Sequence, residues 1–81
     1  MVQKPKIYKL SDIKPGSKCC VRRIMRKPSV SKRLVEMGIS RGSVVEVIRT
    51  APLGDPIEVK VKGCFLSIRT EEAQTIEVEA S

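Results

Sequence analysis

The sequence predicts a mainly β fold with about five short antiparallel strands and one short helix. Residues 57–62 alternate apolar and charged side chains, which is the pattern of a strand with one buried face. Other short segments rich in β-branched residues are separated by Gly, Pro, Ser and Asp, and only residues 31–37 have helical spacing. Five short strands are too few for a sandwich of normal width, and closure limits exposed edges. We therefore expect a small SH3-like barrel.

The N-terminal third begins with irregular segments. Residues 1–6 are basic and show no periodicity, so we expect a flexible tail in a chain that otherwise forms one domain over residues 1–81. Residues 7–10 are expected to be a short strand or an extended anchor, and residues 11–13 a single helical turn. Pro15-Gly16 ends that turn.

The first full strand is predicted at residues 17–24. Val21 and Ile24 are its apolar pair, but a spacing of three does not fit strict alternation. A β-bulge near Arg22-Arg23 would turn both side chains to the same face. A basic connection over residues 25–29 then leads to the helix.

The helix over residues 31–37 is amphipathic. Val30, Leu34 and Met37 fall on one face, which we expect to cover an open end of the barrel, and the charged residues Lys32, Arg33 and Glu36 point away.

The two ends of this helix carry capping residues. Ser31, or Ser29 before it, is the expected N-cap, and Gly38 is the expected left-handed residue after the last turn. Ile39 then folds back on Leu34 in a Schellman ending.

The C-terminal half is predicted to be three more strands with short connections. Residues 43–50 form a strand with Val45 and Val47 inward, although Val44 and Ile48 leave the opposite register open. Residues 51–56 are a loop by composition. The strand over residues 57–62 turns at Gly63 and pairs with residues 65–69, where Leu66 and Ile68 face inward.

The last segment is predicted to form a short helical turn followed by a strand. Residues 70–74 form the turn, with Thr70 as its N-cap and Glu71 and Glu72 at the positive end of the helix dipole. Residues 75–79 alternate again and close the chain as a strand.

The charge is strongly asymmetric. The formal net charge is +7, and residues 1–49 hold 13 of the 16 Lys and Arg but only three of the nine acidic residues. The densest basic run covers residues 22–33. Such a run is either a solvated surface or a patch that meets nucleic acid, anionic headgroups or an acidic protein.

Catalytic and metal-binding chemistry is not predicted. The chain has no histidine, no P-loop and no nucleophile motif, so we expect a binding module rather than an enzyme, without a cofactor. Cys19, Cys20 and Cys64 show no zinc-ligand spacing, and adjacent strand residues face opposite sides, so no metal site is predicted. With only Tyr8 and Phe65 as aromatic residues, stacking on nucleic-acid bases has little support.

Leu53 is the unusual residue of the loop. It lies between Pro52 and Gly54 at the expected tip, where it either folds back onto the barrel or offers an apolar contact to a partner.

Several segments across residues 8–79 resemble the FeoA family in their order and spacing. They are Leu10–Gly16, Arg33–Gly42, Ala51–Gly63, Leu66–Ala73 and the closing Ile76–Val78. The resemblance implies an SH3-like barrel and a small cytoplasmic, non-enzymatic accessory protein of bacterial ferrous iron uptake. It implies that the partner is a FeoB-type ferrous iron transporter with a cytosolic GTPase-containing region, which would bring the protein to the membrane indirectly.

No motif of the family fixes the contact surface. We expect Leu53 to make an apolar contact, and Arg23, Arg33 and Arg41 to meet acidic groups. The chain is also similar to the C-terminal module of iron-dependent repressors of the diphtheria-toxin-repressor type, so the alternatives are a protein-binding module in metal-dependent regulation and a small basic nucleic-acid-binding barrel. Its oligomeric state is open, because an uncovered barrel edge could pair.

Overall fold

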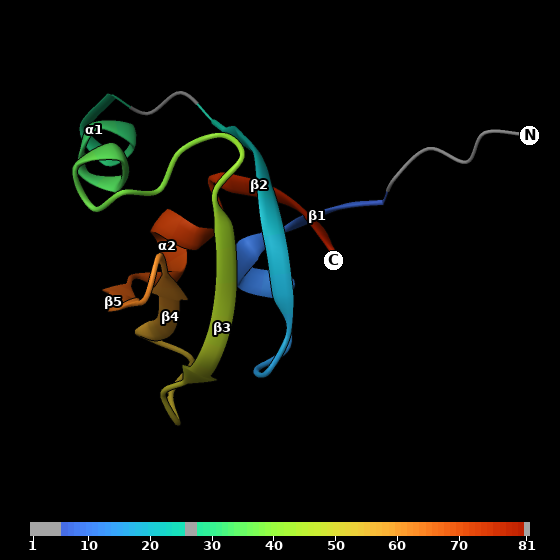
Figure 1. Cartoon of the computed structure of the whole chain (residues 1–81). Helices are drawn as coiled ribbons and strands as arrows, with labels where there is room; N and C mark the ends of the chain where they lie inside the picture. The colour runs from blue at the N-terminus through green and yellow to red at the C-terminus, as the bar shows by residue number, and fades with distance from the viewer. Residues whose placement is uncertain (1–5, 26–27, 81) are drawn as a thin grey trace, which may run out of the picture.

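The computed structural model describes residues 6–25 and 28–80, with the backbone alone for residues 28–31. Six strands form one antiparallel sheet in the order β1-β6-β2-β3-β4-β5 (Figure 1). The strands are β1 (Ile7–Lys9), β2 (Lys18–Ile24), β3 (Val44–Thr50), β4 (Ile57–Val61), β5 (Cys64–Ile68) and β6 (Ile76–Ala80). The other elements are a 3-10 turn η1 (Leu10–Asp12) and the helices α1 (Pro28–Glu36) and α2 (Thr70–Ala73). The mainly β class is confirmed.

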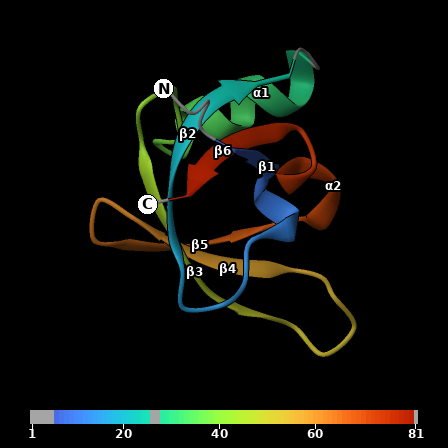
Figure 2. The same ribbon diagram turned by 90° about the vertical axis from the view of Figure 1, so that its right-hand side faces the viewer.

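The sheet is strongly curved but open. Figure 2 shows the strands bending around a common interior, while β1 and β5 remain the two edges of the strand order. The strand beyond the expected five is β1, the short segment for which the sequence predicts either a strand or an extended anchor. It pairs with β6, where Ile7 lies opposite Glu79 and Lys9 lies opposite Glu77. The small SH3-like fold expected from the sequence is therefore confirmed, with the difference that the curled sheet keeps two edges and is not a closed barrel.

The predicted bulge in β2 is present. The register of β2 against β6 shifts between Val21 and Arg23, so that Val21 pairs with Val78 and Ile24 with Ile76. Val21 is fully buried and Ile24 packs against the core, because the extra residue turns both side chains inward.

The start of α1 differs from the prediction. The helix begins at Pro28, three residues before the expected start, because proline is well suited to the first helical position, where its missing N–H is not needed. Ser29 and Ser31 consequently lie inside the helix, and neither is its N-cap. Residues 1–5 of the expected tail, residues 26–27 of the basic connection and the side chain of Val30 lie outside the described parts.

The end of α1 is as predicted. Gly38 has a φ of +90°, its N–H donates to the Val35 carbonyl at 2.9 Å, and the Ile39 N–H donates to the Leu34 carbonyl at 2.9 Å. These are the two hydrogen bonds of a Schellman motif. The motif turns the chain so that Leu34 and Ile39, both fully buried, enter the same core, with Met37 packed against it.

The core lies inside the curled sheet and is completed by Leu10 of η1, Leu34 of α1 and Ala73 of α2. Val45 and Val47 face inward, as predicted, and so do the alternate residues of the other strands. The buried residues of the core are Leu10, Cys19, Val21, Leu34, Ile39, Val45, Val47, Ile57, Val59, Val61, Ile68, Ala73, Ile76 and Val78. Ile68 is fully buried and Leu66 packs on the cluster, as expected for β5.

Candidate partner-binding surface

The loop between β3 and β4 presents Leu53 to solvent. The Leu53 side chain is 96% exposed, so it does not fold back onto the sheet. Leaving a leucine in water forgoes about 1.5–3 kcal/mol of burial free energy. A leucine in this position is available to an apolar pocket on another molecule.

The loop that carries Leu53 is held by hydrogen bonds. Within it, the Gly54 N–H donates to the Ala51 carbonyl at 2.7 Å and the Ala51 N–H donates to the Pro56 carbonyl at 3.0 Å. Against α2, the Thr70 hydroxyl donates to the Gly54 carbonyl at 2.6 Å. The exposed leucine is thus presented by a loop of fixed conformation, which lowers the conformational entropy lost on binding.

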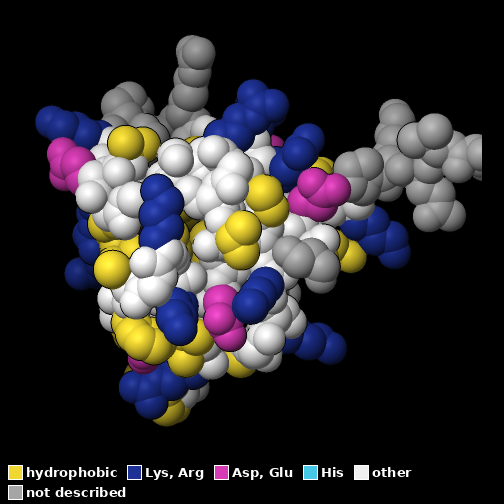
Figure 3. All heavy atoms as spheres, viewed as in Figure 1, with side chains coloured by type: hydrophobic (Ala, Val, Ile, Leu, Met, Phe, Trp, Pro, Cys, Tyr) yellow, Lys and Arg dark blue, Asp and Glu magenta, His cyan; other side chains and the backbone are white. Residues whose placement is uncertain are grey.

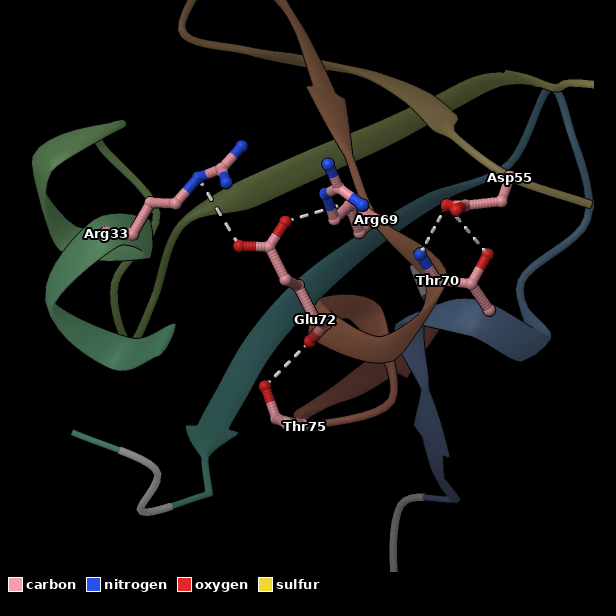
Figure 4. Close-up of polar contacts among 6 residues, drawn as sticks. All are labelled: Arg33, Asp55, Arg69, Thr70, Glu72 and Thr75. Atoms are coloured by element: carbon pink, nitrogen blue, oxygen red, sulfur yellow. Dashed lines mark hydrogen bonds and ion pairs between the residues drawn. The ribbon is translucent and has the colours of Figure 1, made fainter. Parts of the chain in front are cut away.

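Asp55 caps α2 from the loop (Figure 4). The Thr70 N–H donates to Asp55 Oδ1 at 2.8 Å, and Thr70 is the first helical residue. The prediction that Thr70 is the N-cap is therefore wrong: Arg69 holds that position, and a carboxylate distant in sequence accepts the first free N–H of the helix. The loop and the helix stabilise one another through this contact.

Glu72 links α2 to α1. Its side chain is only 4% exposed, and Oε2 lies 3.4 Å from Nε of Arg33, which reaches across from α1 (Figure 4). Oε1 accepts the Arg69 N–H at 3.0 Å, and the Thr75 hydroxyl donates to the Glu72 carbonyl at 2.7 Å. A buried carboxylate needs such partners, because an unpaired one would carry a large desolvation cost.

The three predicted arginines have different surroundings. Arg33 is half exposed and forms an ion pair with Glu72. It therefore stabilises the fold and also contributes positive charge to the surface. Arg23 keeps 73% of its side chain exposed, with Nε 3.9 Å from Glu77 Oε1. Arg41 is exposed, and no ion pair to it occurs in the described residues.

The structure does not gather all four predicted contact residues at one point. The turn that holds Arg41 precedes β3 and is attached to β2, since the Gly42 N–H donates to the Val21 carbonyl at 2.8 Å. Arg23 lies further along the same strand β2, whereas Leu53 follows the other end of β3. Seven strand residues span about 23 Å. Leu53 therefore lies at one end of β3, and Arg41 with Arg23 at the other.

A hollow of about 470 Å³ opens at the base of the Leu53 loop. Its lining includes Pro52 and Pro56 of the loop and the ion pair between Arg49 and Glu58, whose Nε and Oε2 are 3.0 Å apart. The surface beside Leu53 thus combines an apolar wall with a paired charge.

The described residues offer no metal centre. Within residues 6–25 and 28–80, no three His, Cys, Asp or Glu side chains are placed to hold an ion. Cys19 is buried, Cys20 half-buried and Cys64 exposed. Burial, with a smaller contribution from Cys20, raises the pKa of the Cys19 thiol to about 11.

Asp55, Thr70 and Glu72 were not recognised as a cluster in the sequence. The sequence predicts only local roles for Thr70, as an N-cap, and for Glu72, at the positive end of the helix dipole. Nothing in it indicates that Asp55, 15 residues before Thr70, reaches Thr70. The contact depends on the path of the loop, which alternation patterns do not specify.

Comparisons with known proteins agree on one family. Residues 8–80 match the FeoA domain. A Fe(2+) transport protein A/Fe(2+) transporter FeoB fusion protein of Porphyromonas gingivalis is 34% identical over 71 residues, which cover 88% of this chain and 8% of the relative. This chain therefore spans about a twelfth of that relative.

Solved structures share the fold. A FeoA protein from Chlorobium tepidum, with 42% identity, superposes with a TM-score of 0.84 over 90% of this chain and 70% of the other. A manganese-dependent transcriptional repressor superposes with a TM-score of 0.89 over 96% of this chain and 38% of its own, but its 24% identity indicates a shared fold alone. No helix in the described segments is long and apolar enough to cross a membrane.

Proposed function

We propose, because this chain belongs to the FeoA family, that it is a non-enzymatic accessory protein of ferrous iron uptake that binds the cytosolic side of a FeoB-type transporter. The relative from Porphyromonas gingivalis supports the choice of partner, since its name joins a Fe(2+) transport protein A to a FeoB transporter in one chain. Covalent fusion holds two modules at a high effective concentration, which is useful when the modules act together.

The observation that carries the proposal is the exposed Leu53 on its anchored loop. A partner that buries this leucine regains the burial free energy that the isolated chain forgoes. Because hydrogen bonds to Thr70 already hold the loop, little ordering is required on binding. Leu53 is therefore our candidate for the central apolar contact.

The basic residues extend the proposed surface. A standard interface covers about 800 Å² on each partner, which corresponds to a patch roughly 30 Å across. Such a patch is wide enough to include Leu53 at one end of β3 and Arg41 with Arg23 at the other. The arginines would steer an acidic partner surface and raise the association rate more than the final affinity.

An amide NMR titration with the transporter's cytosolic region tests the proposal. We expect shifts that centre on residues 51–56 and extend to α2, because the loop and the helix share hydrogen bonds. The same titration with a mixed-sequence oligonucleotide at moderate salt is the control, and it should leave these amides unchanged. Shifts with the oligonucleotide alone, weakening steeply as salt rises, would instead support nucleic-acid binding.

A further inference from the structure

The edge strand β5 has one free side. It is last in the sheet order, and among the described strands it pairs with β4 alone. The turn between them consists of Lys62 at φ +51° and Gly63 at φ +80°, a two-residue hairpin turn with both residues left-handed. In such a hairpin the flanking residues form a hydrogen-bonded pair, and these pairs then alternate along the ladder. They are Val61 with Cys64, Val59 with Leu66, and Ile57 with Ile68.

The alternation turns the backbone groups of Phe65 and Ser67 outward. Their N–H and C=O groups point away from β4, and neither residue bonds to a turn, loop or cap in residues 6–25 and 28–80. Phe65 is 61% exposed, and Ser67 is exposed as well. This edge therefore offers two donors and two acceptors in the spacing that an added strand requires.

The free edge is bordered by positive charge. No residue of β5 is charged, but Nζ of Lys60 lies 5.5 Å from the centre of the Phe65 ring, and Lys62 and Arg69 flank the strand. None of these three cations is in an ion pair within the described parts, whereas the nearby Glu58 is bound by Arg49. On the face shown in Figure 3, Lys and Arg side chains lie among hydrophobic ones at the lower left, where Figure 1 places β4 and β5.

We propose that the free edge of β5 binds an extended acidic segment of a partner protein as an added strand. Backbone hydrogen bonds to Phe65 and Ser67 would supply the register. Alternate acidic side chains would share the face of Arg69 and of Lys60, which lies over Phe65, and Lys62 would add positive charge at the turn. The chain already contains this chemistry in β6, where Glu79 and Glu77 approach Arg22 and Arg23 of β2 at 3.5 and 3.9 Å.

A second copy of the chain fits this edge less well. Two antiparallel β5 strands that join Phe65 to Ser67 of the copy would bring Arg69 beside the basic turn at Lys62 and Gly63 of the copy. Like charges that face one another across strands are destabilising, and each chain carries a net charge of +7. An acidic strand removes this repulsion. Ser67 also lines the hollow beside the Leu53 loop, so the two surfaces adjoin. The inference is tested without the transporter, because its probe is a peptide alone.

A capped peptide of alternating glutamate and valine is the probe. We expect it to slow hydrogen exchange at the amides of Phe65 and Ser67 at low salt, and we expect a matched lysine–valine peptide to leave them unprotected. Equal binding of the two peptides, or no protection by the acidic peptide, would overturn the proposal. Protection that rises with protein concentration in the absence of peptide would assign the edge to a second copy and also overturn it.

Two variants sharpen the test. Ser67→Pro removes an outward donor, and an edge strand tolerates proline where its N–H faces solvent. We expect it to lower the affinity for the acidic peptide roughly fivefold or more, which is the effect of one lost hydrogen bond. Lys62→Glu should weaken it too, whereas Lys14→Glu, at another exposed lysine, should change affinity little. Unchanged affinity in both Ser67→Pro and Lys62→Glu contradicts the proposal, and the second variant remains informative should the first fail to fold.

Discussion

The interior of the sheet and the α2 end of the molecule are stabilised in different ways. In the sheet, residues such as Val47 and Val59 are fully buried and belong to a cluster of apolar side chains. At α2, a buried carboxylate, two threonines and a loop aspartate hold the parts together by hydrogen bonds and an ion pair. Apolar packing tolerates small rearrangements, whereas a polar cluster requires all its members. Substitutions that remove one group from each region should therefore behave differently.

The largest effect is expected for Ile68→Ala in the sheet. Ile68 is fully buried on β5, so the truncation leaves a cavity and should lower the free energy of unfolding by about 2–5 kcal/mol. Urea denaturation measures this change. Val44→Ala, at a side chain 55% exposed, is the matched control and should change stability by about 0.5 kcal/mol or less. Equal losses in the two variants would contradict the placement of the core.

Glu72→Ala tests the polar cluster. It leaves the Arg69 N–H and the Arg33 guanidinium without their acceptor, and we expect a loss of about 1–3 kcal/mol. Glu71→Ala, on the same helix but exposed, should have little effect. If the two alanine variants unfold at the same urea concentration, Glu72 does not join α1 to α2 as described.

Thr70→Val should loosen the Leu53 loop with a smaller loss of stability. The variant keeps the backbone bond to Asp55 but loses the hydroxyl bond to Gly54, which is worth about 1 kcal/mol. We expect faster hydrogen exchange at the amides of Ala51 and Gly54, measured by NMR. Ser17→Ala, which also removes a hydroxyl but at an exposed position before β2, is the control and should leave these rates unchanged.

Alkaline pH tests the buried thiol of Cys19. The pKa of the Cys19 thiol is raised from 9.0 to about 11, so above pH 9 the unfolded chain loses this proton before the folded chain does. Stability contributed by this group is complete below pH 9 and is lost as pH rises towards 11. The urea midpoint should fall less steeply over this range in Cys19→Ala than in the unchanged protein; parallel curves would show that Cys19 does not titrate in this way.

The parts of the fold that were predictable are those set by local patterns. Alternation in residues 57–62 predicted β4, and the odd spacing of Val21 and Ile24 predicted the bulge, because side-chain direction in a strand has a period of two. Gly38 predicted the Schellman ending, since a left-handed residue is needed there. These features depend on neighbours a few residues away.

The contacts that could not be predicted join distant segments. Asp55 reaches Thr70, and Arg33 reaches Glu72, through the path of the chain in space. The curvature of the sheet likewise decides that β1 and β5 stay apart as edges. The sequence indicates that Leu53 is unusual, but it leaves open whether the side chain folds back onto the sheet or faces solvent. The exposure of Leu53 in the structure decides between the two.

The affinity of Leu53→Asp for the transporter's cytosolic region tests the central proposal most directly. Leu53 is 96% exposed, so the substitution should leave the stability of the chain nearly unchanged while it places a charge in an apolar contact. We expect at least a tenfold loss of affinity, about 1.4 kcal/mol, by calorimetric titration. Ile7→Asp, at an exposed apolar position of the edge strand β1 outside the proposed surface, is the control and should bind normally. Equal affinities for the unchanged protein and Leu53→Asp would show that the loop is not the contact.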